Sequence, residues 1–130
     1  MVVTSLPHVL IVDDEHDILE ELEELLTSRG YAVTTAARIA DALHAIDANS
    51  EIGTLVTDLK LAGDSGLDLV RACKAKDMAR GSRMRFAVMT AQTDLTTTLC
   101  GELEEAGITL MTKPVPIPGL LRFVSGAADA

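Results

Sequence analysis

Aromatic side chains are scarce in this sequence: of its 130 residues only Tyr31, Phe86 and Phe123 are aromatic, and tryptophan is absent. A platform that stacks the bases of single-stranded nucleic acid needs several aromatics on one basic face, and these three lie too far apart along the chain to provide it. The hydrophobic fraction of 48% nevertheless argues against an intrinsically disordered chain. We therefore expect a single domain, residues 1–130, with a core built from aliphatic side chains.

Positive charge is also in short supply, with 11 Lys and Arg against 20 Asp and Glu and a net charge of −9. This balance argues against a surface that binds duplex nucleic acid over the whole domain, because phosphate contacts require Lys and Arg. The deficit is concentrated in residues 1–65, which carry 13 acidic and 3 basic side chains. Four glutamates between residues 20 and 24 contribute to it, and a solvated helix face is their simplest interpretation.

Cysteines and long apolar runs are few as well. Cys73 and Cys100 have no CxxC partner, so we expect small buried or half-buried thiols rather than a zinc site. The N-terminal residues lack the basic region of a signal peptide, and the longest apolar runs are about five residues, against roughly 20 for a membrane helix. These absences favour a cytoplasmic protein with no membrane contact.

Five short apolar runs alternate with five helical patterns. The predicted strands are His8–Val12, Tyr31–Thr34, Thr54–Thr57, Phe86–Met89 and Ile108–Met111. Apolar residues at helical spacing predict helices near residues 18–26, 39–46, 67–73, 95–106 and 120–124, and residues 59–66 are predicted to form a loop. Strict alternation of this kind predicts an α/β fold, a doubly wound five-stranded parallel sheet with helices on both faces.

Unusual polar residues follow four of the predicted strands. They are Asp13 and Asp14 after the first, Asp58 after the third, Thr90 after the fourth and Lys113 after the fifth. Open α/β sheets bind their ligands outside the carboxyl ends of the strands. A single acid in such a position commonly caps a helix, and Asp14 alone would fit that role. Five polar residues from four strands favour a binding or reaction site instead.

The charges of these residues suggest a chemistry. Three closely packed carboxylates repel one another, and a divalent cation such as Mg²⁺, which prefers oxygen ligands, resolves the repulsion. A carboxylate can act as a nucleophile and form an acyl phosphate, and Asp58 is the candidate because it stands alone at the end of a central strand. Asp13 and Asp14 would then hold the metal, while Lys113 and Thr90 would contact the phosphoryl group.

Several motifs, taken in order, carry a resemblance to a known family. They are Leu10–Glu15, Val56–Leu61, Gly63–Leu67, Met89–Ala91 and Thr112–Pro114. Together they closely resemble a bacterial response-regulator receiver domain, and the likeness extends from Leu10 to about Val124. It implies a flavodoxin-like sheet with strand order 2-1-3-4-5 and a single receiver domain over residues 1–130.

The resemblance also implies roles for the polar residues. Asp58 would accept a phosphoryl group from a sensor histidine kinase or a histidine phosphotransfer protein. Asp14, Asp58 and the backbone carbonyl of Lys60 would bind Mg²⁺ or Mn²⁺ directly, and Asp13 would act through water. Thr90 would move toward the phosphoryl group, and the Lys113–Pro114 bond would be cis. The domain would signal to a downstream protein effector, without acting as an enzyme on other substrates and without binding nucleic acid directly.

Three departures from the family pattern stand out. Ala62 replaces a usual proline, which suggests a looser loop, and the stretch Lys76–Arg85 is long and basic. Leu110 stands where the family usually has Tyr or Phe, the side chain that turns inward when the threonine moves. Two interpretations follow: signalling runs through Thr90 and the following loop alone, or the output face lies elsewhere.

Other polar residues near the predicted site have weaker interpretations. We expect His16 to be an exposed helix residue rather than a metal ligand, while Lys60 and Gln92 flank the site and would tune dephosphorylation by family resemblance. A basic cluster comprises Arg71, Lys74, Lys76, Arg80, Arg83 and Arg85. A solvated face is its simplest interpretation, and docking to an acidic partner is the alternative.

Three alternatives to a stand-alone phospho-acceptor remain. The chain could be the receiver half of a longer regulator. It could be a phosphatase of the haloacid-dehalogenase type, although such enzymes carry a second Asp where this chain has Lys60. A flavin- or nucleotide-binding module is the third, but neither GxxxxGK[ST] nor GxGxxG is present.

Overall fold

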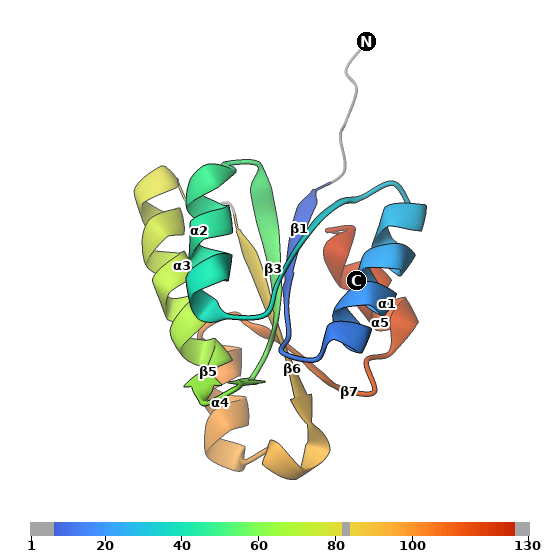
Figure 1. Ribbon diagram of the computed structural model, residues 1–130. Helices are drawn as coiled ribbons and strands as arrows, with labels where there is room; N and C mark the ends of the chain where they lie inside the picture. The colour runs from blue at the N-terminus through green and yellow to red at the C-terminus, as the bar shows by residue number, and fades with distance from the viewer. Residues whose placement is uncertain (1–6, 82–83, 127–130) are drawn as a thin grey trace.

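A five-stranded parallel sheet forms the centre of the computed structural model, which describes residues 7–81 and 84–126 (Figure 1). Its strands are β1 (His8–Val12), β2 (Ala32–Ala36), β3 (Ile52–Asp58), β6 (Arg85–Ala91) and β7 (Thr109–Lys113). Their spatial order is β2-β1-β3-β6-β7, and every neighbouring pair is parallel. This order is the predicted 2-1-3-4-5 arrangement, so the α/β fold class is confirmed.

Helices cover both faces of this sheet. They are α1 (His16–Ser28), α2 (Ile39–Ala48), α3 (Gly66–Arg80), α4 (Thr97–Glu105) and α5 (Ile117–Val124). Helices α2 and α3 lie on one face of the sheet, and α1 and α5 lie on the other, as Figure 1 shows. A single 3₁₀ turn, η1 (Gln92–Asp94), precedes α4.

The apolar core is divided into two clusters by the sheet. In β1, Leu10 and Val12 pack in the cluster beneath α2 and α3, whereas Val9 and Ile11 pack in the cluster beneath α1 and α5. All four side chains are fully buried, because successive residues of a strand point to opposite faces and both faces are covered. The continuous apolar run in the sequence is thus explained by a central parallel strand.

The bounds of several elements differ from the predicted ones, and the largest differences lie beside β3 and before α4. The expected loop at residues 59–66 contains a small antiparallel hairpin, formed by β4 (Lys60–Leu61) and β5 (Asp64–Ser65). The fourth helix begins at Thr97, two residues beyond Leu95, because the Thr96 side chain caps it by accepting a hydrogen bond from the Leu99 N–H at 3.0 Å.

The two cysteines occupy the environments expected of them. Cys73 of α3 is buried, and its burial raises the pKa of the thiol to about 12, while Cys100 of α4 is half-buried. A thiol in such an apolar setting packs as a small hydrophobic group and is a poor nucleophile. Among the described residues, every helix falls short of the length and apolar character that crossing a membrane requires.

Candidate functional site

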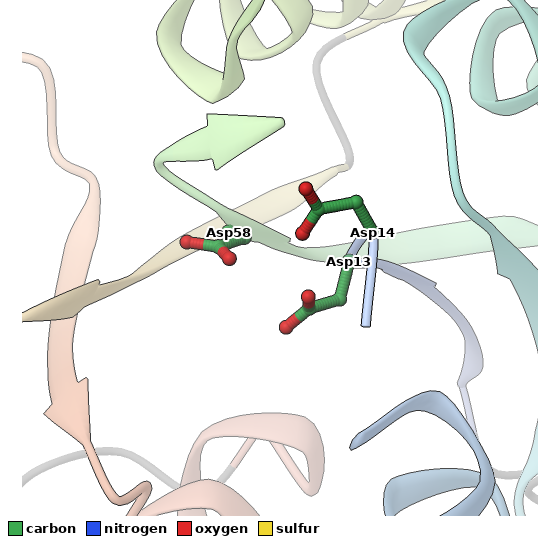
Figure 2. A group of neighbouring side chains, drawn as sticks. All are labelled: Asp13, Asp14 and Asp58. Carbon is green, nitrogen blue, oxygen red and sulfur yellow. The ribbon is translucent and has the colours of Figure 1, made fainter. Parts of the chain in front are cut away.

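Three carboxylates gather at the carboxyl ends of two neighbouring central strands. Asp13 and Asp14 directly follow β1, and Asp58 is the last residue of β3. Each offers an oxygen that lies within 4.8 Å of the oxygens of the other two, and Figure 2 shows the three side chains gathered where β1 and β3 end. In the described part of the chain, this is the one group of acidic, His or Cys side chains with the spacing of a metal site.

A single ammonium group contacts two of these carboxylates. Lys113 ends β7, which is separated from β3 by β6, and its side chain reaches across to the acidic group. Its Nζ lies 2.9 Å from Asp58 Oδ2 and 3.0 Å from Asp13 Oδ2. The peptide bond from Lys113 to Pro114 is cis, as the family resemblance implied. Three carboxylates against one ammonium leave the site with an excess of negative charge.

Burial makes that excess costly. Asp13 is fully buried, and desolvation raises the pKa of its carboxyl group despite hydrogen bonds from the Glu15 N–H and from Lys113. Burial would lower the pKa of Lys113, but its hydrogen bonds to Asp58 and Asp13 outweigh this effect and raise it. A cation placed among the three carboxylates would offset both the desolvation of Asp13 and the mutual repulsion.

The backbone around Asp58 is closely packed. The Leu59 N–H donates to the Met89 carbonyl at 2.8 Å, and the Gly66 N–H donates to the Leu59 carbonyl at 2.7 Å. A Cβ atom on Gly66 would lie 2.0 Å from the carbonyl oxygen of Asp58, so no other residue fits there without a backbone shift. Gly66, which lies in the predicted loop and in the Gly63–Leu67 motif, therefore permits the close approach of α3 to the Asp58 backbone.

Two other predicted site residues lie beside the carboxylates with partners of their own. Thr90 is buried in β6, and its hydroxyl donates to the Ala91 carbonyl at 3.2 Å. The Lys60 N–H donates to Asp58 Oδ1 at 3.3 Å, while its ammonium forms an exposed ion pair at 2.8 Å with Asp94 of η1. Asp94 is not among the residues that the sequence predicts for the site, because nothing in the sequence pattern links residues 34 positions apart.

His16 and Leu110 lie outside this group of residues. His16 is exposed at the first position of α1 and is not one of the clustered groups, which agrees with its interpretation as a surface residue. Leu110 is paired with Val88 in the sheet and packs, half-buried, against the core beneath α2 and α3. The side chain of Gln92 is outside the described part of the structure, as is Arg83.

The described residues of the predicted basic cluster have partners within their own chain. Lys76 lies 2.8 Å from Asp47 of α2, and Arg80 donates to the carbonyl of Ile46 at 3.4 Å. Arg71 forms an exposed ion pair with Asp68 within α3. Lys74 donates to the Ala106 carbonyl, and the guanidinium of Arg85 lies 4.4 Å from the centre of the Phe123 ring. Four of these cations, Lys74, Lys76, Arg80 and Arg85, therefore contact other elements of their own chain as well as facing solvent to different degrees.

The fold and this constellation of residues agree with a match to a family of known proteins. A model of the response regulator receiver domain matches residues 9–124. The chain therefore belongs to the response-regulator receiver domain family, whose members serve in two-component signalling.

Individual relatives show how far the similarity extends. The transcriptional regulatory protein FixJ of Azorhizobium caulinodans is 39% identical over 94 residues, covering 70% of this chain and 40% of FixJ. A response regulator receiver protein from Pseudomonas putida is 30% identical, with a TM-score of 0.82 over 95% of this chain and 99% of the other. The FixJ match covers less than half of that protein, whereas the P. putida match covers nearly the whole of both chains.

A more distant structural likeness concerns a complex. The receiver domain of Saccharomyces cerevisiae Ssk1, solved with the histidine phosphotransfer protein Ypd1, is 18% identical with a TM-score of 0.78, over 95% of this chain and 89% of the other. At this identity the likeness shows the fold alone. The chain spans between 10% and 49% of the length of the curated relatives that it matches, so those relatives have further regions.

Proposed function

We propose that this protein is a phospho-acceptor switch in which Asp58 receives a phosphoryl group from a phosphohistidine. The observation that supports this most directly is the contact of Lys113 Nζ with Asp58 Oδ2 at 2.9 Å, beside two further carboxylates. An ammonium in this position can neutralise the charge that arrives with a phosphoryl group. Phosphoryl transfer needs mainly positioning and charge neutralisation, and both are supplied by the chain's own residues.

The acidic group also fits a divalent cation. We propose that Asp14, Asp58 and the backbone carbonyl of Lys60 bind Mg²⁺ or Mn²⁺ directly, and that Asp13 acts through water. The fit rests on three carboxylates paired with one ammonium and on the burial that raises the pKa of Asp13. When bound, the cation would neutralise the charge of the carboxylates and of the incoming phosphoryl oxygens.

The transfer itself is a substitution at phosphorus. A carboxylate oxygen of Asp58 forms the new P–O bond, the P–N bond of the donor breaks, and the imidazole leaves with the electron pair of that bond. Lys113, already hydrogen-bonded to Asp58, then pairs with the phosphoryl oxygens. The Thr90 hydroxyl, which donates to Ala91 in this structure, would instead donate to the phosphoryl group.

We infer that the signal leaves the site through Thr90 and the η1 segment, because Leu110 offers neither a ring nor a hydroxyl at the usual aromatic position. Leu110 packs against the core instead of lying free at the surface. The test is Leu110→Tyr: unchanged binding of the effector by the phosphorylated variant supports this route. A large change in effector binding would place the output on the β7 face.

The phosphodonor is proposed to be a sensor histidine kinase or a histidine phosphotransfer protein. Family membership supports it, and so does the solved complex of the Ssk1 receiver with Ypd1. Within residues 1–130 we propose one receiver domain, cytoplasmic and not an enzyme, acting as a stand-alone regulator or as the receiver part of a longer one. An immunoblot of the native protein distinguishes the two forms by mass.

The proposal is tested with a small phosphodonor such as acetyl phosphate in the presence of Mg²⁺. Intact-mass spectrometry should detect an acid-stable, base-labile adduct that Asp58→Asn does not form. Asp64→Asn is the matched control, since Asp64 is an exposed acid of the β5 strand outside the carboxylate group. Phosphate uptake by Asp58→Asn would contradict the assignment of the nucleophile. No adduct from any donor or kinase would contradict the switch itself.

A further inference from the structure

The small hairpin beside the site turns through Ala62 and Gly63. Lys60 pairs with Ser65 and Leu61 with Asp64, so Ala62 and Gly63 form a two-residue turn. Both have positive φ, 36° for Ala62 and 94° for Gly63. Two-residue hairpin turns with positive φ at both positions match the twist of the strands that they join. The hairpin is therefore a regular one, with an unusual residue at its first turn position.

Ala62 adopts a conformation that its Cβ atom disfavours. Alanine rarely occupies the left-handed region, and such strain persists only where the surrounding structure holds it in place. The Ala62 N–H donates a hydrogen bond of 3.1 Å to Asp14 Oδ2, from a position 48 residues along the chain. Proline at this position could do neither, since its φ is fixed near −65° and it has no N–H.

Asp14 depends on this hydrogen bond for its orientation. It is the exposed member of the three carboxylates, and among the described residues no other group donates to it. An exposed carboxylate without a partner samples several rotamers, and ordering it lowers the affinity for whatever it binds. The Ala62 N–H occupies one oxygen of Asp14 and leaves the second for another ligand.

We propose that the Ala62–Gly63 turn is a positioning element for the cation site, in which the Ala62 N–H pre-orients Asp14 for a divalent cation. The inference rests on the proposed function for the cation but not on phosphorylation. The sequence suggested that Ala62, in the position of a usual proline, loosens the loop. In this proposal Ala62 instead supplies a backbone N–H that proline lacks, and this N–H donates to the site. Donors to metal-ligating side chains commonly fix ligand orientation in this way.

Two substitutions at the same position test the proposal. Ala62→Gly keeps the N–H and accepts positive φ, whereas Ala62→Pro removes the N–H and the conformation together. We expect Mg²⁺ affinity, measured by calorimetric titration, to stay within about twofold in Ala62→Gly and to fall about tenfold in Ala62→Pro. Equal Mg²⁺ affinity of the two folded variants would overturn the proposal.

A second measurement avoids proline and needs no metal. In Asp14→Ala without Mg²⁺, amide exchange at Ala62 should accelerate about five- to tenfold, because its acceptor has been removed. The Gly66 amide, which donates to Leu59, is the internal reference and should not change. Unchanged exchange at Ala62 would refute the hydrogen bond from Ala62 to Asp14, even if Ala62→Pro does not fold. Failure of the wild-type protein to bind Mg²⁺ would instead contradict the proposed function. The exchange result would still show whether the Ala62 N–H donates to Asp14.

Discussion

The two ends of the sheet use charged residues in opposite ways. At the carboxyl end, three carboxylates share one ammonium, so negative charge is left uncompensated within a partly buried site. At the amino end, Arg85 of β6 lies over the Phe123 ring and donates to the Phe123 carbonyl, and Lys74 donates to the carbonyl of Ala106. These cations donate to carbonyl oxygens of their own chain, and Arg85 also faces an aromatic ring, so each has a partner that joins elements of the fold.

His8, also at the amino end of the sheet, has a hydrogen-bond partner for each of its two ring nitrogens. One of its ring nitrogens lies 2.7 Å from the Thr34 hydroxyl and the other lies 3.2 Å from the Asn49 amide. The ring thereby joins β1, β2 and the end of α2. Polar groups with complete sets of partners stabilise the fold. A cluster of charged side chains in which one sign exceeds the other, such as the three carboxylates, indicates where a ligand of the opposite charge is expected.

The largest change in stability is expected from a substitution at Gly66, which lies against the Asp58 backbone at the carboxyl end of the sheet. Gly66→Ala should lower the free energy of unfolding by about 3 kcal/mol, because its Cβ atom would lie 2.0 Å from the Asp58 carbonyl oxygen. Urea denaturation measures the change. The matched control is Gly101→Ala in α4, where a Cβ meets nothing within 4 Å. That control should gain up to about 1 kcal/mol of stability, since alanine is the better helix former.

A second prediction compares one lysine from each end. Without Mg²⁺, Lys113→Met should cost about 2 kcal/mol of stability, because it leaves buried Asp13 and Asp58 without a counter-ion. Mg²⁺ should restore part of this loss. Lys74→Met should cost less than about 1 kcal/mol, since it removes a hydrogen bond to a neutral carbonyl. Urea titrations with and without Mg²⁺ measure both, and a Mg²⁺-dependent effect at Lys74 would refute the contrast.

The amino end can also be tested by itself. Arg85→Met should lower stability by about 1 kcal/mol, through loss of the cation–π contact with Phe123 and of the hydrogen bond to the last turn of α5. Thermal unfolding followed by circular dichroism measures this loss. The Mg²⁺ affinity of the variant should equal that of the wild type, and a weaker affinity would show that the two ends are coupled.

The smallest expected effect is that of an ion pair on the surface. The Lys76 ammonium lowers the pKa of the Asp47 carboxyl below its ordinary value of 3.8. The contribution of this ion pair to stability is therefore present above pH 3.8 and is lost as the pH falls through the folded-state pKa of Asp47. The melting temperature of the wild type should exceed that of Asp47→Asn at pH 6, and the difference should shrink below pH 3.8. In a Lys76→Met background this pH dependence should become smaller, and the remainder is expected from Arg80, whose Nη2 lies 4.0 Å from Asp47 Oδ1.

The sequence predicted the alternation of strands and helices because each element has enough residues to show a hydrophobic period. The run from His8 to Val12 gave the first strand with correct bounds. The strand order came from family resemblance, since periodicity carries no information about which strands are neighbours. The β4–β5 hairpin was missed because its strands have two residues each and Ala62-Gly63 is not a common turn pair.

The residues at the strand ends could be named from the sequence for a topological reason. Parallel strands direct all their carboxyl ends to one end of the sheet, and the strand order implied by the family resemblance brings Asp13, Asp58 and Lys113 within contact distance there. Their detailed partners could not be predicted. The ion pair of Lys60 with Asp94, and the contacts of Lys74 and of Arg85, depend on side-chain reach between elements far apart in sequence.

Lys113 lies 100 residues after Asp13 and 55 after Asp58, and it approaches both only across β6. A growing chain that has emerged from the ribosome through Asp58 already carries the three carboxylates but not their ammonium partner. The site acquires its counter-charge only when the last strand joins the edge of the sheet. Contacts between residues this far apart in the sequence are slow to form. In the proposed switch, Asp58 would therefore have its ammonium partner only once β7 is in place, and a chain without β7 would lack part of the acceptor site.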